Sequence, residues 1–287
     1  MTLTRSAEYD AFGPWILPVT DLDGVPRVFR DYPFDFASAD LVLKLPRDIA
    51  RRDATPDMHL YDRMLIVDAT GITVLVRDGD VFAVTGISAD AIAAVETGSE
   101  LLDGWLTVFG IDGSRIEVPY NGTSRAVMST VAERLIDLAG GSGGSWHEPQ
   151  ALELQALGES DVALVNAYNE LRDSGFELLA TYPGFSPRSK ESLLARILKG
   201  RVRLSTAIIC GNDRQLVVLS RRAWLTYRGK PDLSMRSLVV VRSRVTSVES
   251  SAHPLVHDVT DVMMHAGKAV LRCAVPNDSQ AFAALTA

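Results

Sequence analysis

The chain has 287 residues, of which 47% are hydrophobic and 23% are charged, and its formal net charge at pH 7 is -7. This composition is typical of a folded protein and excludes a disordered one, and the length is sufficient for two ordinary domains. The negative charge argues against broad binding of nucleic acid, which depends on a basic surface that neutralises phosphates.

The chain begins with MTLTRSAEYDAFGPWILPV, which lacks the basic start and the apolar centre of a signal peptide. No apolar run reaches the ~18 residues that a membrane-spanning helix needs. The two cysteines, Cys210 and Cys273, match no metal-binding spacing, so we expect buried thiols in a reducing compartment. Together these features predict a cytoplasmic protein.

Residues 1–35 form an N-terminal extension that is rich in large apolar side chains. These side chains are Tyr9, Phe12, Trp15, Ile16, Phe29 and Tyr32. Folded proteins normally bury most side chains of this kind. We therefore expect the extension to dock onto the domain that follows it.

Residues 36–138 are predicted to be a first domain that consists mostly of strands. MLIVDATGITVLVRDG favours a hairpin that turns between Asp68 and Gly71, because β-branched residues occupy both of its arms. VFAVTGI (81–87) and AIAAVETG (91–98) are further strand candidates. The pair Asp112-Gly113 is a strong turn signal and predicts a last hairpin.

The first domain is expected to end in a helix that either Thr123 or Ser124 caps. Its apolar face would consist of Val127, Val131, Leu135 and Leu138. Residues 139–175 follow as a linker between domains. The stretch AGGSGGSWHEP at its start is typical of a flexible coil, and the remainder favours a helical connector.

Residues 176–287 are predicted to be a second domain that repeats the first. RMLIVDATGITVLVRDG matches RQLVVLSRRAWLTYRGK, AIAAVETG matches RVTSVESS, and each copy has a late Val-Pro pair. The offsets are 151 residues from Arg63 to Arg214, 153 from Glu96 to Glu249 and 157 from Pro119 to Pro276. Three matches in the same order, with offsets that grow slowly, indicate a tandem duplication of a whole domain, because loops tolerate small insertions.

The second domain should then contain the same late elements as the first. SLVVVRS (237–243) is a strand candidate, and a hairpin is expected to turn near Ala266-Gly267. Asp278 or Ser279 is expected to cap a short final helix.

Antiparallel strands that end in one helix resemble bacterial pleckstrin-homology-like domains, whose bent barrel is capped by a C-terminal helix. The I/V-x-x-V-E stretch, the last hairpin and the final helix carry this resemblance, which covers roughly residues 40–138 and 175–287. It implies an α+β fold, mainly antiparallel β, with two bent barrels that are each closed by a C-terminal helix. No diagnostic catalytic motif accompanies it.

The resemblance implies a non-catalytic scaffold or protein-interaction protein that needs no cofactor. Its partner would be another protein or a second copy of the chain, and nucleic acid is not expected. The alternative is peripheral binding of anionic lipid or a phosphorylated ligand, at the inner face of the membrane in the case of lipid. A fold alone does not fix a function, so these remain expectations.

Basic side chains gather in the loop after the first strand of each unit, although the global charge is negative. They are Lys44, Arg47, Arg51 and Arg52 in the first unit and Arg188, Lys190, Arg196, Lys199, Arg201 and Arg203 in the second. Lys and Arg bind phosphate oxygens through charge-assisted hydrogen bonds. These loops are therefore candidate anion sites, with a solvated loop containing local ion pairs as the competing interpretation.

Three other groups of residues are weighed for chemistry. Glu96 and Glu249 could work as an acid–base pair, but equivalent positions in separate units favour a structural role for each. SKESLLARILKGR (189–201) is basic and amphipathic, and could pack on its own domain, on a partner or on a membrane. His253 and His257 are weak candidates for a metal site, because Pro254 interrupts a helical spacing.

Overall fold

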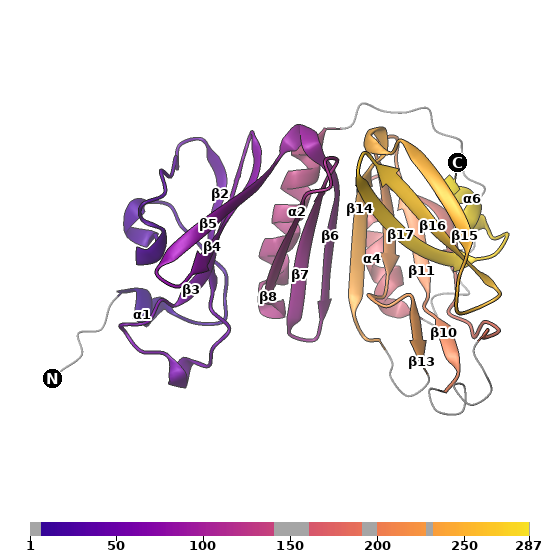
Figure 1. Cartoon of the computed structure of the whole chain (residues 1–287), viewed down its shortest axis with the longest axis horizontal. Coiled ribbons are helices and arrows are strands. Elements are labelled where there is room, and N and C mark those ends of the chain that lie inside the picture. Colours follow the sequence, from indigo (N-terminus) through magenta and orange to yellow (C-terminus); the bar gives the residue numbers. More distant parts are fainter. Residues whose placement is uncertain (1–6, 141–160, 191–199, 228–231, 287) are drawn as a thin grey trace.

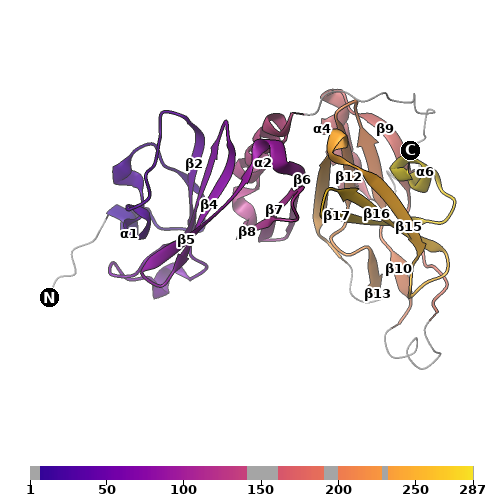
Figure 2. The same ribbon diagram turned by 45° about the horizontal axis from the view of Figure 1, so that its top comes forward.

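The computed structural model describes residues 7–140, 161–190, 200–227 and 232–286. Antiparallel strands dominate, with a smaller share of helix, which confirms an α+β fold that is mainly antiparallel β. The N-terminal sheet, the helix α2 with its strands, and the C-terminal half follow one another along the long axis (Figures 1 and 2). The predicted Gly/Ser coil lies almost entirely outside the described residues, as do Arg196 and Lys199.

The described N-terminal half contains one short helix, five one-turn 3-10 helices written as η, eight strands and one long helix. Its elements are α1 (Ala7–Ala11), β1 (Leu17–Pro18), η1 (Leu22–Gly24), η2 (Arg27–Phe29), β2 (Ala39–Pro46), η3 (Arg51–Asp53), β3 (Tyr61–Asp68), β4 (Gly71–Asp78), β5 (Val81–Ser88), η4 (Ala89–Ala91), β6 (Ile92–Glu100), β7 (Asp103–Gly110), β8 (Arg115–Asn121), η5 (Gly122–Ser124) and α2 (Arg125–Ala139).

The first described element of the C-terminal half is a helix, and strands follow it. Its elements are α4 (Val162–Asp173), β9 (Glu177–Tyr182), β10 (Val202–Leu204), β11 (Ala207–Gly211), β12 (Gln215–Ser220), β13 (Leu225–Tyr227), β14 (Met235–Val241), η6 (Arg242–Arg244), β15 (Ser247–Ala252), β16 (Val259–Ala266), β17 (Ala269–Pro276) and α6 (Gln280–Thr286).

The predicted hairpins and strands are confirmed where turn residues marked them. Asp68 pairs with Gly71 at the turn between β3 and β4, and its Oδ1 accepts a hydrogen bond from the Thr70 N–H at 2.7 Å. The hairpins at Asp112-Gly113 and at Ala266-Gly267 join β7 to β8 and β16 to β17. Local turn chemistry was therefore a sufficient signal for these elements.

One seven-stranded sheet runs through both halves, in the order β8-β7-β6-β14-β12-β11-β9. Its centre is an antiparallel pairing of β6 from the N-terminal half with β14 from the C-terminal half, which registers Thr97 opposite Ser237 and Val95 opposite Val239. The other main sheets are β1-β2-β3-β4-β5 and β15-β16-β17. No closed barrel is found among the described strands, so the predicted closure of each unit is not observed.

The two halves repeat one order of elements, in which β2, β3, β4 and β5 correspond to β9, β11, β12 and β14. The strands β6, β7 and β8 then correspond to β15, β16 and β17, and a helix follows in each half. Asn212 turns the β11–β12 hairpin as Asp68 turns the β3–β4 hairpin, with Oδ1 accepting from the Arg214 N–H at 2.9 Å. The predicted match of Arg63 with Arg214 was therefore wrong, because it aligned β3 with β12, and β12 is the counterpart of β4.

A separate segment covers the outer face of the first sheet in each half. In the N-terminal half the extension does this, burying Phe12, Val25 and Phe29 against residues of β2, β3 and β4. In the C-terminal half α4 does it, packing Leu164 and Tyr168 against β11 and β12. The expected docking of the extension is thus observed.

The helix α2 buries a face that differs slightly from the predicted one. Met128, Val131 and Leu135 are fully buried, whereas Val127 and Leu138 are only partly buried. Ser124 makes no capping hydrogen bond, because its Oγ accepts from the Ile16 N–H at 3.0 Å and so fastens the extension. In α6 the expected cap is present, with the Ser279 Oγ accepting from the Phe282 N–H at 3.2 Å.

We expect Phe29→Ala to lower the free energy of unfolding by about 3–5 kcal/mol, the usual cost of emptying a core position of this size. Phe29 is 0% exposed and its ring contacts that of Phe82 at a centroid distance of 5.7 Å. Denaturant unfolding followed by circular dichroism measures the change. Leu22→Ala, at a position that is 58% exposed, is the matched control and should change stability little. Equal effects of the two variants would show that the extension is not part of the core.

Candidate functional site

A groove with a volume of about 400 Å³ lies on one face of the seven-stranded sheet, between α2 and α4. Its walls come from the two helices and its floor from β6, β14 and β12. A helix is ~10 Å wide and covers about two strands spaced ~4.8 Å apart. Because α2 packs mainly on β6 and α4 packs on β11 and β12, the strand between them, β14, is only partly covered.

Small polar side chains line the middle of the groove floor. Thr97 and Ser99 of β6 lie opposite Ser237 and Met235 of β14, and all four border the groove. Apolar side chains supply the lower walls, including Ile136 of α2, Leu171 of α4 and the nearby Phe176. The groove therefore has a shallow polar centre between two apolar sides.

The upper walls of the groove are acidic. Glu133 and Asp137 of α2 and Glu170 of α4 line it with exposed side chains, and none of the three forms an ion pair with another described residue. Arg125 is the exposed basic side chain of the lining. Arg236 also borders the groove, but its side chain points to the opposite face of the sheet, where Glu96 neutralises its charge. A cationic ligand is thus favoured over an anionic one.

The opposite face of the same sheet carries a half-buried ionic network that joins the two halves. The Glu96 Oε2 accepts from the Arg236 Nε at 2.9 Å and lies 2.8 Å from its second nitrogen, while Oε1 accepts from the Trp105 Nε1 at 3.0 Å. Both side chains of the ion pair are shielded, at 15% and 10% exposure. Trp224 packs its ring against the Arg236 guanidinium at 5.4 Å. These contacts make Glu96 a structural residue.

Glu249 lies at the position of β15 that corresponds to Glu96 on β6, as expected from the sequence match. Its side chain is 64% exposed and lies 3.6 Å from the His265 Nε2. The two carboxylates bind different partners in different sheets, so the structure does not bring them together as an acid–base pair.

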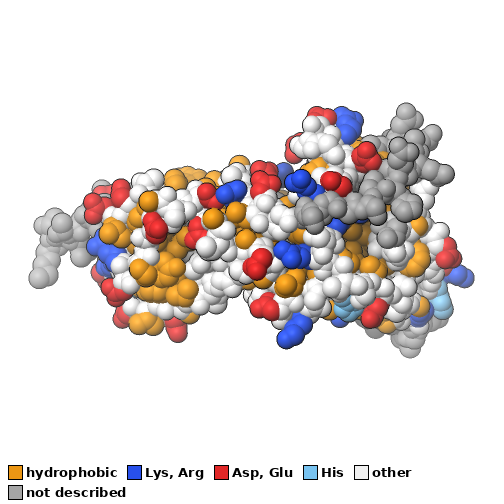
Figure 3. Space-filling model, turned by 90° about the horizontal axis from the view of Figure 1, so that it is seen from above, with side chains coloured by type: hydrophobic (Ala, Val, Ile, Leu, Met, Phe, Trp, Pro, Cys, Tyr) orange, Lys and Arg blue, Asp and Glu red, His pale blue; other side chains and the backbone are white. Residues whose placement is uncertain are grey.

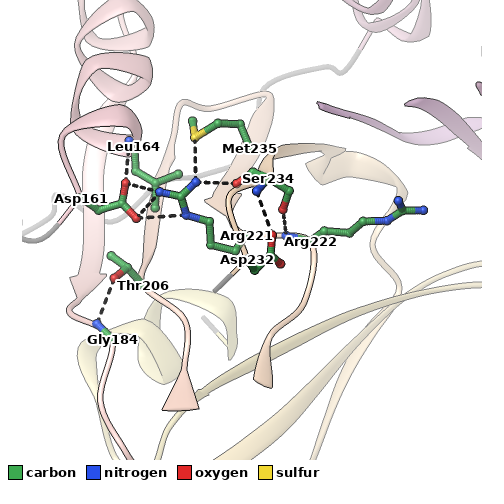
Figure 4. Close-up of polar contacts among 9 residues, drawn as sticks. All are labelled: Asp161, Leu164, Gly184, Thr206, Arg221, Arg222, Asp232, Ser234 and Met235. Atoms are coloured by element: carbon green, nitrogen blue, oxygen red, sulfur yellow. Dashed lines mark hydrogen bonds and ion pairs between the residues drawn. The ribbon is translucent and has the colours of Figure 1, made fainter. Parts of the chain in front are cut away.

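A second ionic cluster fixes the start of α4 to the C-terminal half (Figure 4). Asp161, which caps α4 by accepting from the Leu164 N–H, also accepts from the Arg221 Nη2 at 2.7 and 2.8 Å and from the Arg221 Nε at 3.2 Å. Arg221 further donates to the Ser234 carbonyl at 2.6 Å, just before β14. Asp232 then accepts from the Ala223 and Ser234 N–H groups. Asp161 and Arg221 thus fix the start of α4, the second wall of the groove, to the segment before β14.

The basic residues predicted for the first loop bind mainly to the N-terminal extension. Lys44 Nζ donates to the Gly24 carbonyl at 3.0 Å, and burial lowers its pKa. Arg51 donates to the Phe12 carbonyl at 2.7 Å and stacks on the Tyr9 ring at 4.4 Å. Arg47 is half-buried, and Arg52 is highly exposed beside Asp53. Two of these four predicted anion ligands therefore hold the extension in place.

Two of the described basic residues of the second loop, Arg188 and Lys190, are also paired within the chain. Arg188 forms a double contact with Asp258, at 2.7 Å for the shortest, and this hydrogen bonding lowers the pKa of Asp258 to about 2. Lys190 Nζ donates to the His253 carbonyl at 2.8 Å. The two basic loops belong to opposite halves and do not combine into one site, so anion binding stays a prediction.

The histidines predicted as weak metal ligands have separate surroundings. The His253 Nδ1 accepts from the Leu255 N–H at 3.1 Å, and its Nε2 lies 3.8 Å from Asp261. His257 is exposed. Within the described ranges no cluster of three or more His, Cys, Asp or Glu side chains could hold a metal ion.

Both cysteines are buried free thiols, as expected. Burial raises the pKa of Cys210 and of Cys273 to about 12 in each case. A thiol with such a pKa is almost wholly protonated at neutral pH, and the thiolate is the nucleophile. Neither cysteine is suited to covalent catalysis.

Sequence reasoning missed the groove, because its residues come from five separate segments that the β6–β14 pairing brings together. A weak signal was present in the strands themselves. Thr97, Ser99 and Ser237 are small polar residues at positions where strands of a two-sided core would carry apolar ones. Small polar residues in a strand indicate that a position is exposed, but they do not show which helices lie beside it.

No known protein family matches this chain, and no curated protein matches it. Among the helices that the structure describes, none has the length and apolar character needed to cross a membrane.

We expect Glu96→Gln to destabilise the protein by about 3 kcal/mol, because it leaves the Arg236 charge shielded from water and unpaired. The thermal unfolding midpoint and the denaturant midpoint both measure this loss. Glu249→Gln is the matched control, since it makes the same change at the corresponding exposed position and should cost little. A Glu96→Gln protein as stable as the control would contradict a structural role for the ion pair.

Proposed function

We propose that this protein is a non-catalytic interaction scaffold, and that it binds an amphipathic helix of a partner protein in the groove between α2 and α4. The single observation that carries the proposal is this open groove, placed where the sheet is continuous but its helical cover is interrupted. A tandem duplication of two pleckstrin-homology-like units is proposed as its framework. The repeated order of strands, each set followed by a helix, supports that part.

A helix fits the groove better than an extended peptide does. The floor is made of central strands, whose backbone groups are already paired on both sides, so a peptide cannot add as a further strand there. An amphipathic helix needs only an apolar strip with side chains at i, i+3, i+4 and i+7 to lie between two existing helices. Ile136, Leu171 and Phe176 offer apolar contacts on both sides of such a helix.

The charge of the walls specifies the kind of helix. Glu133 and Asp137 on one side and Glu170 on the other would face the polar flanks of the bound helix. Lys and Arg on those flanks would therefore favour the correct partner and accelerate its association. The partner chemistry proposed is an apolar strip with basic residues on both sides.

Binding of anionic lipid or a phosphorylated ligand, the alternative role, has weaker support. Lys44, Arg51, Arg188 and Lys190 already bind within the chain, and an anion would have to displace those contacts. The acidic side chains that would contact the proposed helix, in contrast, are exposed and have no described ion-pair partner.

We expect a displayed library of random helical peptides, selected on the immobilised full chain, to yield amphipathic sequences with an excess of Lys and Arg. Selected peptides should bind Ser237→Trp at least about tenfold more weakly, because the indole would occupy the groove floor. The double variant Glu133→Lys/Asp137→Lys should also bind them more weakly, with an effect that shrinks as salt is added. Fluorescence anisotropy with labelled peptides measures both changes.

Thr130→Trp is the matched control, because Thr130 is an exposed residue of α2 that does not line the groove. It should bind the selected peptides as the wild type does. Peptides that bind Ser237→Trp undiminished, or a selection that yields acidic sequences, would contradict the proposed site. Thermal unfolding of each variant establishes that it is folded before binding is compared.

A further inference from the structure

Among the sheet edges in the described part of the chain, β5 and β15 are the two that correspond to the strands of the β6–β14 junction. β5 is the last strand of the N-terminal sheet, and β15 is the first strand of the three-stranded sheet. β5 corresponds to β14, since each ends in a one-turn 3-10 helix before the next strand. β15 corresponds to β6 in the same way. The partner of each free edge would therefore be the other one.

We infer that β15 of one molecule pairs with β5 of a second molecule, in the antiparallel register of the internal junction, so that copies associate head to tail. Within one chain the two strands belong to opposite halves (Figure 1). The partner strand is thus supplied by another copy. This inference concerns sheet edges alone and does not depend on the groove or its ligand.

The hydrogen-bonding groups of the β5 edge point outward at the residues that this register requires. The Ala89 N–H donates to the Thr70 carbonyl, and hydrogen-bonded pairs alternate along antiparallel strands. Thr85 and Ala83 therefore bond to β4, while the N–H and C=O groups of Val84 and Gly86 face away from it. These two residues correspond to Ser237 and Val239, which bond to β6 in the junction.

The free edge of β15 presents its backbone N–H and C=O groups at the matching residues. The His253 N–H donates to the Val259 carbonyl, so alternate residues back to Ser251 and Glu249 bond to β16. Val248 and Ser250 then present their backbone groups to the free side. They correspond to Val95 and Thr97, which bond to β14 in the junction. When the register of β6 with β14 is applied to β15 and β5, Val84 lies opposite Ser250 and Gly86 lies opposite Val248.

The sequence of β5 lacks the features that usually keep an edge strand from pairing. VFAVTGIS contains no charge and no proline, and Val81 and Val84 are 64% and 51% exposed. Exposed apolar side chains also gather elsewhere over the N-terminal half, at the left of Figure 3. By contrast β8, an edge of the seven-stranded sheet, carries Arg115, Glu117 and Pro119. Charges and proline protect edges, so β8 is protected where β5 is open.

The contact between molecules would be weaker than the junction it copies. In the junction Glu96 forms an ion pair with Arg236, the residue diagonal to it on β14. Glu249 holds the place of Glu96 on β15, but Ala83 holds the place of Arg236 on β5. The ion pair is therefore missing, and the association should be reversible and dependent on concentration. Because the two surfaces differ, such contacts form rings or open chains of copies rather than closed pairs.

Two proline variants test the arrangement by mixing. Val84→Pro and Ser250→Pro each remove one outward N–H and leave the bonds to the neighbouring strand in place. Analytical ultracentrifugation should show wild-type oligomers that grow with concentration, and a monomer for each variant alone. An equimolar mixture of the two variants should form a dimer and stop there, because each variant keeps one competent edge.

Charge variants at one position test the register in chains that keep every backbone group. Ala83→Arg should strengthen self-association about two- to fivefold, since it supplies the missing partner of Glu249, and Ala83→Glu should weaken it by a similar factor. Glu249→Arg should restore association when combined with Ala83→Glu. Ala83 is exposed, so neither substitution should alter folding, and circular dichroism checks that.

Three results would overturn the inference. A wild-type chain that stays monomeric at the highest concentration reached would exclude the contact. A Ser250→Pro protein that still dimerises while Val84→Pro does not would show that β5 pairs with β5 instead. Equal effects of Ala83→Arg and Ala83→Glu on association would exclude the register, whatever the proline variants show.

Discussion

The pairing of β6 with β14 is the contact on which the rest of this structure depends. It converts two sheets into one seven-stranded sheet, and it sets α2 and α4 on the same face of that sheet. Backbone bonds alone would leave the register free to shift, and the ion pair of Glu96 with Arg236 restricts it. Gly98 contributes as well, because a Cβ there would collide with the Trp105 ring and the Met235 carbonyl oxygen. The junction therefore combines close backbone approach with a shielded charge pair.

The elements that could be predicted from the sequence are those that local chemistry determines. Turn residues such as Asp68, Asp112 and Gly267 marked hairpins, the apolar spacing marked α2, and the Ser279 cap marked α6. The strand containing Glu96 and its counterpart containing Glu249 were also matched correctly. The match of Arg63 with Arg214 failed because consecutive hydrophobic strands of one sheet resemble one another, and a shift by one strand preserves the pattern of β-branched residues.

The candidate site could not be predicted, because it depends on which edge strands meet. The sequences of β6 and β14 do not show that the two strands pair, because every strand offers the same backbone N–H and C=O groups. The basic residues were misleading for a related reason. The sequence places Lys44 and Arg51 at an expected loop, where basic side chains are normally exposed. In the structure, however, the backbone carbonyls of the extension accept their hydrogen bonds. Contacts with the N-terminal extension thus determine whether these basic side chains are free to bind a ligand or are used to hold the fold together.

The β6–β14 pairing also means that the halves are connected twice, once by the covalent chain and once by the sheet. Gly140 and Asp161 bound the covalent connection, and neither half needs that connection to make its contacts at the junction. A protein with this design can be divided into two polypeptides that reassemble through their strands.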